Sequence, residues 1–246
     1  MSSFGTFTGF LQVPWGDYLG NLGVGLLRTL AYTVASFVGA AALGLALALM
    51  RLNSLRLVRL PAAVYTEIFK NVPLLAIIFV TYFGLPSVGI KLSVFAAGVL
   101  SLVLFYAAYL SEIFRAAIAG IHSGQNEAAQ ALGLGRGTTF GQVILPQALR
   151  LALPGTNTMF VDLLKSTSLL VTISAAELMT QAQLIASETF RALEVYLVIA
   201  AIYFAVCYPV SQCLLLLERT IQAGVPLSRG RRRRLKLAKT LLAGGA

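Results

Sequence analysis

Long apolar runs separated by short polar stretches are the dominant pattern of this sequence. Three of these runs contain no charged residue: residues 29–50, 92–111 and 195–217. Each has roughly the 20 residues that a helix needs to cross the hydrocarbon core of a membrane. The pattern therefore predicts three uninterrupted membrane-spanning helices.

Two further apolar runs, residues 60–85 and 151–176, are long enough to span a membrane but are interrupted by polar residues. Each run contains an acid, a base and a proline: Glu67, Lys70 and Pro73 in the first, and Asp162, Lys165 and Pro154 in the second. Intramembrane charges are costly and proline breaks helix hydrogen bonding, so these two spans are expected to be polar and broken. The predicted fold is an all-α integral membrane protein with five transmembrane helices in one domain, residues 1–246.

The composition agrees with a membrane protein. Hydrophobic residues make up 58% of the chain and charged residues only 11%, whereas a soluble domain carries about 25% charged residues. The net charge of +10 is concentrated in a basic tail, residues 219–246, which we interpret as a cytoplasmic anchor on anionic lipid and not as a nucleic-acid site. Residues 1–21 lack the features of a cleaved signal, and their aromatic side chains predict a segment at the membrane surface.

Lysine and arginine positions predict the orientation, because cytoplasmic connections carry an excess of both. The first connection contains Arg51, Arg56 and Arg59. The third connection, residues 114–150, contains Arg115, Arg136 and Arg150. With five spans, these two connections and the C-terminus share one side of the membrane. That side is predicted to be cytoplasmic, with the N-terminus outside, in a bacterial cytoplasmic membrane.

Small residues recur every fourth position in the first span, at Ser36, Ala40, Gly44 and Ala48. Such a stripe allows two helices to pack closely in lipid. The sequence leaves open whether the partner helix belongs to this chain or to another subunit.

The third connection contains a polar helical pattern between two apolar stretches, in the string GQNEAAQALGLGRGTTFGQVILPQA at residues 124–148. Glu127, Ala128, Ala129 and Ala131 favour a helix, and Gly133 ends it. Closely spaced alanines leave a nearly flat helix surface that another protein can approach. A second helical stretch is expected to lead to Pro146.

Three pairs of opposite charges stand three residues apart: Glu67 with Lys70, Glu112 with Arg115, and Asp162 with Lys165. Neutralisation on one helix face is the simple interpretation of each pair. The first and third pairs lie deeper in their spans, and the third is followed by two hydroxyl residues. These residues are therefore also candidates for the path of a zwitterionic substrate: Glu67, Lys70, Asp162, Lys165, Thr167 and Ser168. The sequence leaves the two interpretations open.

Several strings, in order and spacing, resemble the polar amino-acid permeases of ATP-binding-cassette importers, the histidine/glutamine type. They are TEIFKNVPLL, YFGLP, YLSEIFRAAIAGI, GQNEAAQALGL, VILPQALR and LLKSTSLL, and together they cover roughly residues 20 to 220. One departure is Lys70, where many members have arginine, and this softens any conclusion about the substrate.

The resemblance implies a five-span subunit that pairs with an identical or homologous permease, above two ATPases and below an extracytoplasmic amino-acid-binding protein. It also implies that residues 124–148 form the coupling helix that docks on the ATPase. The residues that would carry coupling are Gly124, Glu127, Ala128, Ala129, Ala131, Gly133 and Pro146. Glu127 would be the acidic anchor, and Gly133 the turn.

The chain itself is not expected to be an enzyme. It has no GxxxxGK phosphate loop, so ATP with magnesium is expected on a separate ATPase subunit. A single histidine and two unpaired cysteines offer no metal site, and no cofactor is expected on this chain. Alternatives are an importer permease for an opine, cystine or an organic ion, a secondary amino-acid carrier, and, more remotely, an intramembrane enzyme. The sequence does not select the cargo.

Overall fold

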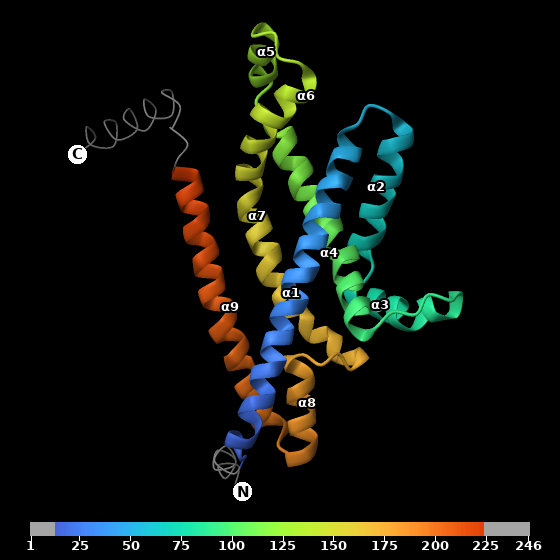
Figure 1. Ribbon diagram of the computed structural model, residues 1–246, viewed down its shortest axis with the longest axis vertical. Coiled ribbons are helices and arrows are strands. Elements are labelled where there is room, and N and C mark those ends of the chain that lie inside the picture. The colour runs from blue at the N-terminus through green and yellow to red at the C-terminus, as the bar shows by residue number, and fades with distance from the viewer. Residues whose placement is uncertain (1–12, 224–246) are drawn as a thin grey trace, which may run out of the picture.

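The computed structural model describes residues 13–223, and this part of the chain is helical without a strand. In chain order the elements are α1 (Trp15–Leu52), α2 (Arg56–Asn71), α3 (Leu74–Phe79), the π-helix η2 (Val80–Gly84), the 3₁₀ helix η3 (Leu85–Val88), α4 (Val94–Ala119), α5 (Gly124–Ala131), α6 (Arg136–Thr138), the π-helix η4 (Thr139–Ile144), α7 (Leu145–Ser166), the 3₁₀ helix η5 (Thr167–Ile173), α8 (Leu178–Thr189) and α9 (Ala192–Ala223). The long helices α1, α4, α7 and α9 run along the length of the molecule (Figure 1).

The centre of the bundle is the contact between α1 and α4. The small residues of α1 lie in this contact: Ser36 and Ala40 are fully buried, and so is Ala48. A Cβ atom on Gly44 would approach the Cβ atom of Leu110 to 2.9 Å. Such spacing permits only glycine without a shift of the helices. The stripe predicted from the sequence is therefore an internal packing surface.

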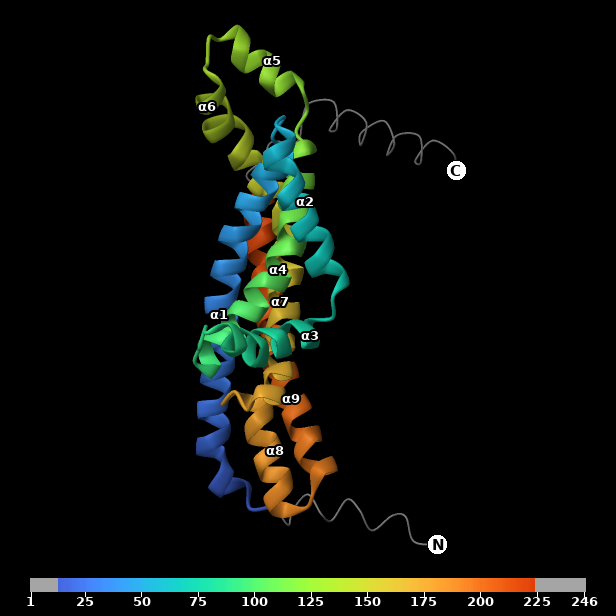
Figure 2. The same cartoon turned by 90° about the vertical axis from the view of Figure 1, so that its right-hand side faces the viewer.

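The first of the two polar runs, residues 60–85, does not form one straight span. α2 ends at Asn71, and the segment that begins with α3 turns away by 107°. Pro73 explains the break, because the residue before a proline is pushed out of helical geometry, and Val72 is extended, with φ −95° and ψ 132°. Figure 2 shows the α3 segment lying across the bundle. The predicted break in the run over residues 60–85 is confirmed, and it takes the form of a bent pair of helical segments.

The helical segment that contains the run over residues 151–176 begins before the run, at Arg136, and ends within it, at Ile173. α6, η4, α7 and η5 follow one another as one helical segment over Arg136–Ile173, and α8 then departs at 50°. Thr139–Ile144 is a π-helix that ends two residues before Pro146, which has no N–H to donate into a regular helix. Residues 177–191, which follow this run in the sequence, contain the helix α8.

Three helices, α1, α4 and α9, are long and apolar enough to cross a membrane, and the count rises to five if each bent pair forms one span. All three uninterrupted runs predicted from the sequence fall within these helices, apart from the first two residues of the second run, which precede α4. α1 begins at Trp15, so residues 15–21 of the predicted surface segment are the first turns of this helix. Residues 1–12 and most of the predicted basic tail, residues 224–246, lie outside the described residues.

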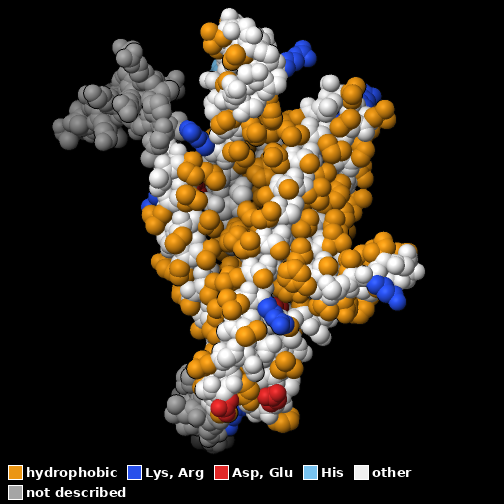
Figure 3. Space-filling model, viewed as in Figure 1, with side chains coloured by type: hydrophobic (Ala, Val, Ile, Leu, Met, Phe, Trp, Pro, Cys, Tyr) orange, Lys and Arg blue, Asp and Glu red, His pale blue; other side chains and the backbone are white. Residues whose placement is uncertain are grey.

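The two ends of the bundle differ in what they display. The connection after α1, the α5–α6 hairpin and the last turn of α9 lie toward one end, and α8 and the start of α1 lie at the other (Figure 1). Hydrophobic side chains cover most of the middle of the face in Figure 3, and acidic side chains gather over the α8 end. The arginines used to predict orientation thus share one end with the α5–α6 hairpin.

Candidate functional site

The polar hairpin at one end of the bundle is built by a short helix and a left-handed glycine. α5 begins at Gly124, whose N–H donates to His122 Nδ1 at 3.0 Å. Gly133 has φ +74°, which glycine adopts without the strain that a Cβ atom adds. Its N–H donates to the carbonyl of Gln130, and the N–H of Leu134 donates to the carbonyl of Ala129. This paired closure is a Schellman motif, and it confirms the predicted helix and glycine turn.

The alanines of α5 do not share one face. Ala129 is 4% exposed and packs into its own hairpin, whereas Glu127, Ala128 and Ala131 are exposed. The expectation that all three alanines meet a partner is therefore corrected for Ala129, which supports the hairpin from inside. Sequence reasoning missed Leu132, a large apolar side chain that is 79% exposed at the end of α5. A leucine next to the glycine that ends a polar helix was the available signal.

The hairpin is joined directly to a long helix of the bundle. After Gly133 the chain enters α6 and continues helically through η4 and exposed Pro146 into α7. The side-chain amide of Gln147 donates to Gln125 Oε1 of α5 at 3.3 Å and to the carbonyl of Val143. α5 is therefore connected to α7 by the hydrogen bond between Gln147 and Gln125 and, after the turn at residues 132–135, by the helical segment that begins with α6.

A cluster of three charges joins α1 to α4 near the same end. Glu112 accepts hydrogen bonds from Arg115 on its own helix and from Arg51 at the end of α1. The i,i+3 neutralisation predicted for Glu112 and Arg115 is confirmed. Because α1 contributes a second arginine, the cluster also holds the two helices in register.

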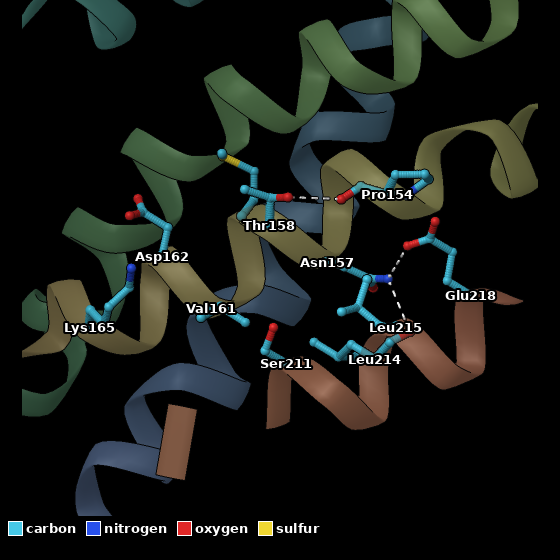
Figure 4. Close-up of a pocket in the computed structure, with 11 residues that line it drawn as sticks. Pro154, Asn157, Thr158, Val161, Asp162, Lys165, Ser211, Leu214, Leu215 and Glu218 are labelled. Atoms are coloured by element: carbon cyan, nitrogen blue, oxygen red, sulfur yellow. Dashed lines mark hydrogen bonds between the residues drawn. The ribbon is translucent and has the colours of Figure 1, made fainter. Parts of the chain in front are cut away.

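A polar pocket of about 550 Å³ opens between α7 and α9 (Figure 4). Asn157 donates to Glu218 Oε2 at 3.2 Å across the two helices. The other two charged side chains of the pocket, Asp162 and Lys165, lie farther along α7 than Asn157. The structure thus brings a carboxylate and an ammonium from one helix into one open cavity, beside amide and carboxylate groups.

Asp162 and Lys165 do not form the ion pair that their spacing predicts. The described ion pairs include Glu67 with Lys70, at 3.9 Å, but none between Asp162 and Lys165. Asp162 Oδ2 instead accepts a hydrogen bond from the Tyr106 hydroxyl of α4 at 2.8 Å. The interpretation as mutual neutralisation is therefore wrong for Asp162 and Lys165, and it is correct for Glu67 and Lys70 on α2.

The other substrate-path candidates lie apart from this pocket. Glu67 and Lys70 are on α2, and neither lines the cavity between α7 and α9. Thr167 is fully buried and donates to the carbonyl of Leu164, and Ser168 donates to the carbonyl of Lys165. Of the six candidates, Asp162 and Lys165 are the two that line the cavity between α7 and α9.

Sequence reasoning also missed Glu177, a completely buried carboxylate between η5 and α8. It accepts the N–H groups of Met179 and Thr180 at 2.9 and 2.8 Å, and so caps α8. The hydroxyl groups of Tyr203 on α9 and Thr29 on α1 also donate to it, at 3.2 and 3.5 Å. One side chain thus connects three helices. An acid before a helix-forming run was the available signal.

Comparison with known protein families gives a match over residues 40–222 to the binding-protein-dependent transport system inner membrane component family. The chain belongs to this family. It is a permease subunit of the amino-acid type of ATP-binding-cassette importer, as the ordered strings in its sequence indicated. It is accordingly a multi-pass membrane protein.

Similar proteins include the probable amino-acid ABC transporter permease protein YckA of Bacillus subtilis, 38% identical over 183 residues, covering 74% of this chain and 81% of the relative. The probable glutamine ABC transporter permease protein GlnM of the same organism is 34% identical and covers 80% of this chain and 92% of the relative. Other relatives are named for transport of L-cystine and octopine.

Among solved structures, an amino acid ABC transporter crystallised with histidines superposes with a TM-score of 0.79 and 36% identity, covering 86% of this chain and 98% of that chain. The MetNI methionine ABC transporter superposes with a TM-score of 0.70 at 18% identity, which shows a shared fold. The helical bundle is therefore the common architecture of these permeases.

Proposed function

We propose that this chain is the membrane-spanning subunit of a binding-protein-dependent, ATP-driven importer that moves a polar L-amino acid, such as glutamine, glutamate or aspartate, into the cell. The observation that carries the proposal is the α5 hairpin, an exposed polar helix joined through Pro146 to the helix that lines the polar pocket. The family membership and the amino-acid relatives support the same cargo class.

In this proposal the α5 end faces the cytoplasm, the N-terminus lies outside, and each bent helix pair counts as one of five spans. The arginines that share an end with α5 support this orientation. Two ATPase subunits bind the α5 hairpins of this chain and of a second permease, identical or homologous. An extracytoplasmic binding protein delivers the amino acid to the α8 end.

Coupling follows from the connection between hairpin and pocket. Closure of the ATPase pair on ATP and magnesium displaces α5, with Glu127 as the acidic anchor, Ala128 and Ala131 at the contact, and Gly124 and Gly133 at its two ends. Because α6, η4 and α7 are one helical segment, the displacement reaches Asp162 and Lys165. Their opposite charges suit the ammonium and carboxylate groups of an amino acid.

The complete importer provides the test of this function. The chain is co-expressed with candidate permease, ATPase and binding-protein subunits from the same genome, reconstituted into proteoliposomes, and offered a mixture of the twenty common L-amino acids, L-cystine and octopine. We expect accumulation of a polar amino acid that requires ATP and the binding protein. Accumulation of L-cystine or octopine would select the alternative cargo, and uptake independent of ATP would favour a secondary carrier.

The coupling role is tested separately by Gly133→Asp, which adds a charged side chain at φ +74°. We expect normal membrane insertion and loss of transport-linked ATP hydrolysis. Gly137→Asp is the matched control, because Gly137 is exposed, has open space around it and does not have a positive φ. If the Gly133 variant keeps full substrate-stimulated ATPase activity, the assignment of α5 is wrong.

The substrate-path residues are separated by comparing Asp162→Asn with Glu67→Gln at equal expression. We expect a raised KM for Asp162→Asn, which lines the pocket, and a smaller effect for Glu67→Gln on α2. Unchanged uptake kinetics in the Asp162 variant would remove this pocket from the path.

A further inference from the structure

Tyr106 of α4 lies next to Asp162, at the end of the pocket that holds Asp162 and Lys165. Its side chain is 1% exposed, and its hydroxyl oxygen lies 2.8 Å from Asp162 Oδ2 and 2.8 Å from Ser166 Oγ. Both neighbours lie on α7, one turn apart. A buried phenol on one helix thus contacts two polar side chains of the helix that lines the cavity.

The directions of these hydrogen bonds follow from the number of protons. A phenol has one hydrogen to donate, and an ionised carboxylate only accepts. Tyr106 therefore donates to Asp162 and accepts from the hydroxyl of Ser166. The result is a directed chain from Ser166 through Tyr106 to Asp162, in which the last bond is of the stronger, charge-assisted kind.

These hydrogen bonds explain why an acid and a base three residues apart on α7 do not form an ion pair. Side chains at this spacing on a helix normally meet and attract each other. The carboxylate of Asp162 is directed to the hydroxyl of α4, and the ammonium of Lys165 stays in the pocket without joining it. Figure 4 shows both side chains at the same end of the cavity.

We propose that Tyr106 is a positioning residue for transport, which holds the Asp162 carboxylate away from Lys165 so that both charges can receive the ammonium and carboxylate groups of one amino acid. The proposal rests on the function proposed above, because it assigns the pocket to the cargo. Ser166 supports the same geometry by orienting the phenol.

A double-mutant cycle in the reconstituted importer tests the proposal, with uptake from the mixture of twenty L-amino acids, L-cystine and octopine measured by mass spectrometry. Tyr106→Phe removes only the hydroxyl group, and we expect KM to rise about tenfold with kcat within about twofold, as for a lost hydrogen bond to a charged group. In an Asp162→Asn background the same change should alter KM by less than about twofold.

Tyr65→Phe is the matched control. Tyr65 also donates from a largely buried phenol to α4, but its acceptor is the backbone carbonyl of Leu104, at 2.8 Å, and it does not line the pocket. We expect its KM to stay within about twofold of the unaltered importer. An equal loss in the Tyr65 and Tyr106 variants, or an undiminished Tyr106 effect in the Asp162→Asn background, would overturn the proposal.

An infrared measurement tests the hydrogen bond without any cargo. The difference spectrum between the intact complex and its Asp162→Asn variant isolates the carboxylate bands of Asp162. We expect these bands to move in the Tyr106→Phe background and to stay in place in the Tyr65→Phe background. Unmoved bands would contradict the positioning role even if uptake falls. A complex with no amino-acid uptake at all, but with moved bands, would contradict the proposed function and leave the hydrogen bond established.

Discussion

The α8 end and the α5 end of this molecule are held in opposite ways. At the α8 end, Glu177 connects three helices from a fully buried position, and a Cβ atom on Gly25 of α1 would lie 3.1 Å from Leu178 Cα. At the α5 end, Ala129 is the one buried residue of α5, and Glu127 and Leu132 are exposed. The α8 helix is part of the bundle, whereas the α5 surface is left for another protein.

The largest expected effect is on the α8 end, from Glu177→Ala. The change removes the cap of α8 and leaves the hydroxyl groups of Tyr203 and Thr29 without their carboxylate acceptor. We expect a loss of about 3 kcal/mol in the free energy of unfolding, measured by thermal denaturation in detergent. Glu177→Gln retains an acceptor oxygen, so its loss should be smaller. Equal losses in both variants would show that the cap contributes little.

Thr29→Val should have an intermediate effect at the same end. The hydroxyl of Thr29 accepts the N–H of Leu178 at 3.1 Å, and valine leaves this buried N–H without an acceptor. We expect a loss of about 1.5 kcal/mol and faster hydrogen exchange in the first turn of α8. Thr33→Val is the control, because this buried hydroxyl donates only to the carbonyl of Thr29 within α1. A loss of stability in Thr33→Val as large as that in Thr29→Val would contradict a special role of the bond between Thr29 and the N–H of Leu178.

At the α5 end, Gly133→Ala is expected to lower stability by about 1 kcal/mol or less. The cause is the positive φ of this turn, since the space around Gly133 is open. Gly137→Ala on the same hairpin has open space and no positive φ, so we expect it to be neutral or slightly stabilising. Hydrogen exchange of the α5 amides reports the local effect. Identical behaviour of the two variants would show that the left-handed turn is not what ends α5.

The smallest expected change in stability comes from Leu132→Ser, because this side chain is 79% exposed. We expect the free energy of unfolding to stay within about 0.5 kcal/mol, while substrate-stimulated ATP hydrolysis in the assembled importer falls severalfold. Leu149→Ser, at a 44% exposed leucine of α7 beyond the hairpin, is the control. Full activity of the Leu132 variant would exclude this leucine from the ATPase contact.

Hydrophobic length, charge and turn chemistry were readable because they are local. The uninterrupted runs fall almost entirely within α1, α4 and α9, and Gly133 ends α5 as its place after the alanines predicted. The neutralisation of Glu112 by Arg115 was also local, three residues apart on one helix. Each of these features depends on neighbours within about one helical turn.

The misassigned features depend on residues distant in the sequence. Asp162 is beside Lys165 on its helix, but its hydrogen bond goes to Tyr106, 56 positions away. Pro73 predicted a break in the helix, but it did not predict the 107° angle between α2 and the segment that follows. The hydrogen bonds of Glu177 to Thr29 of α1 and Tyr203 of α9 also join residues that are distant in the sequence.

The sequence by itself determined that this is a helical membrane permease of the amino-acid importer type, because apolar length, charge placement and the ordered strings are properties of the linear chain. The tertiary structure alone decided that the small-residue stripe of α1 packs on α4, that Ala129 faces inward, and that Asp162 and Lys165 stay apart in one pocket. The physical reason is that the burial of a side chain and the choice among its possible hydrogen-bond partners depend on which helices become neighbours.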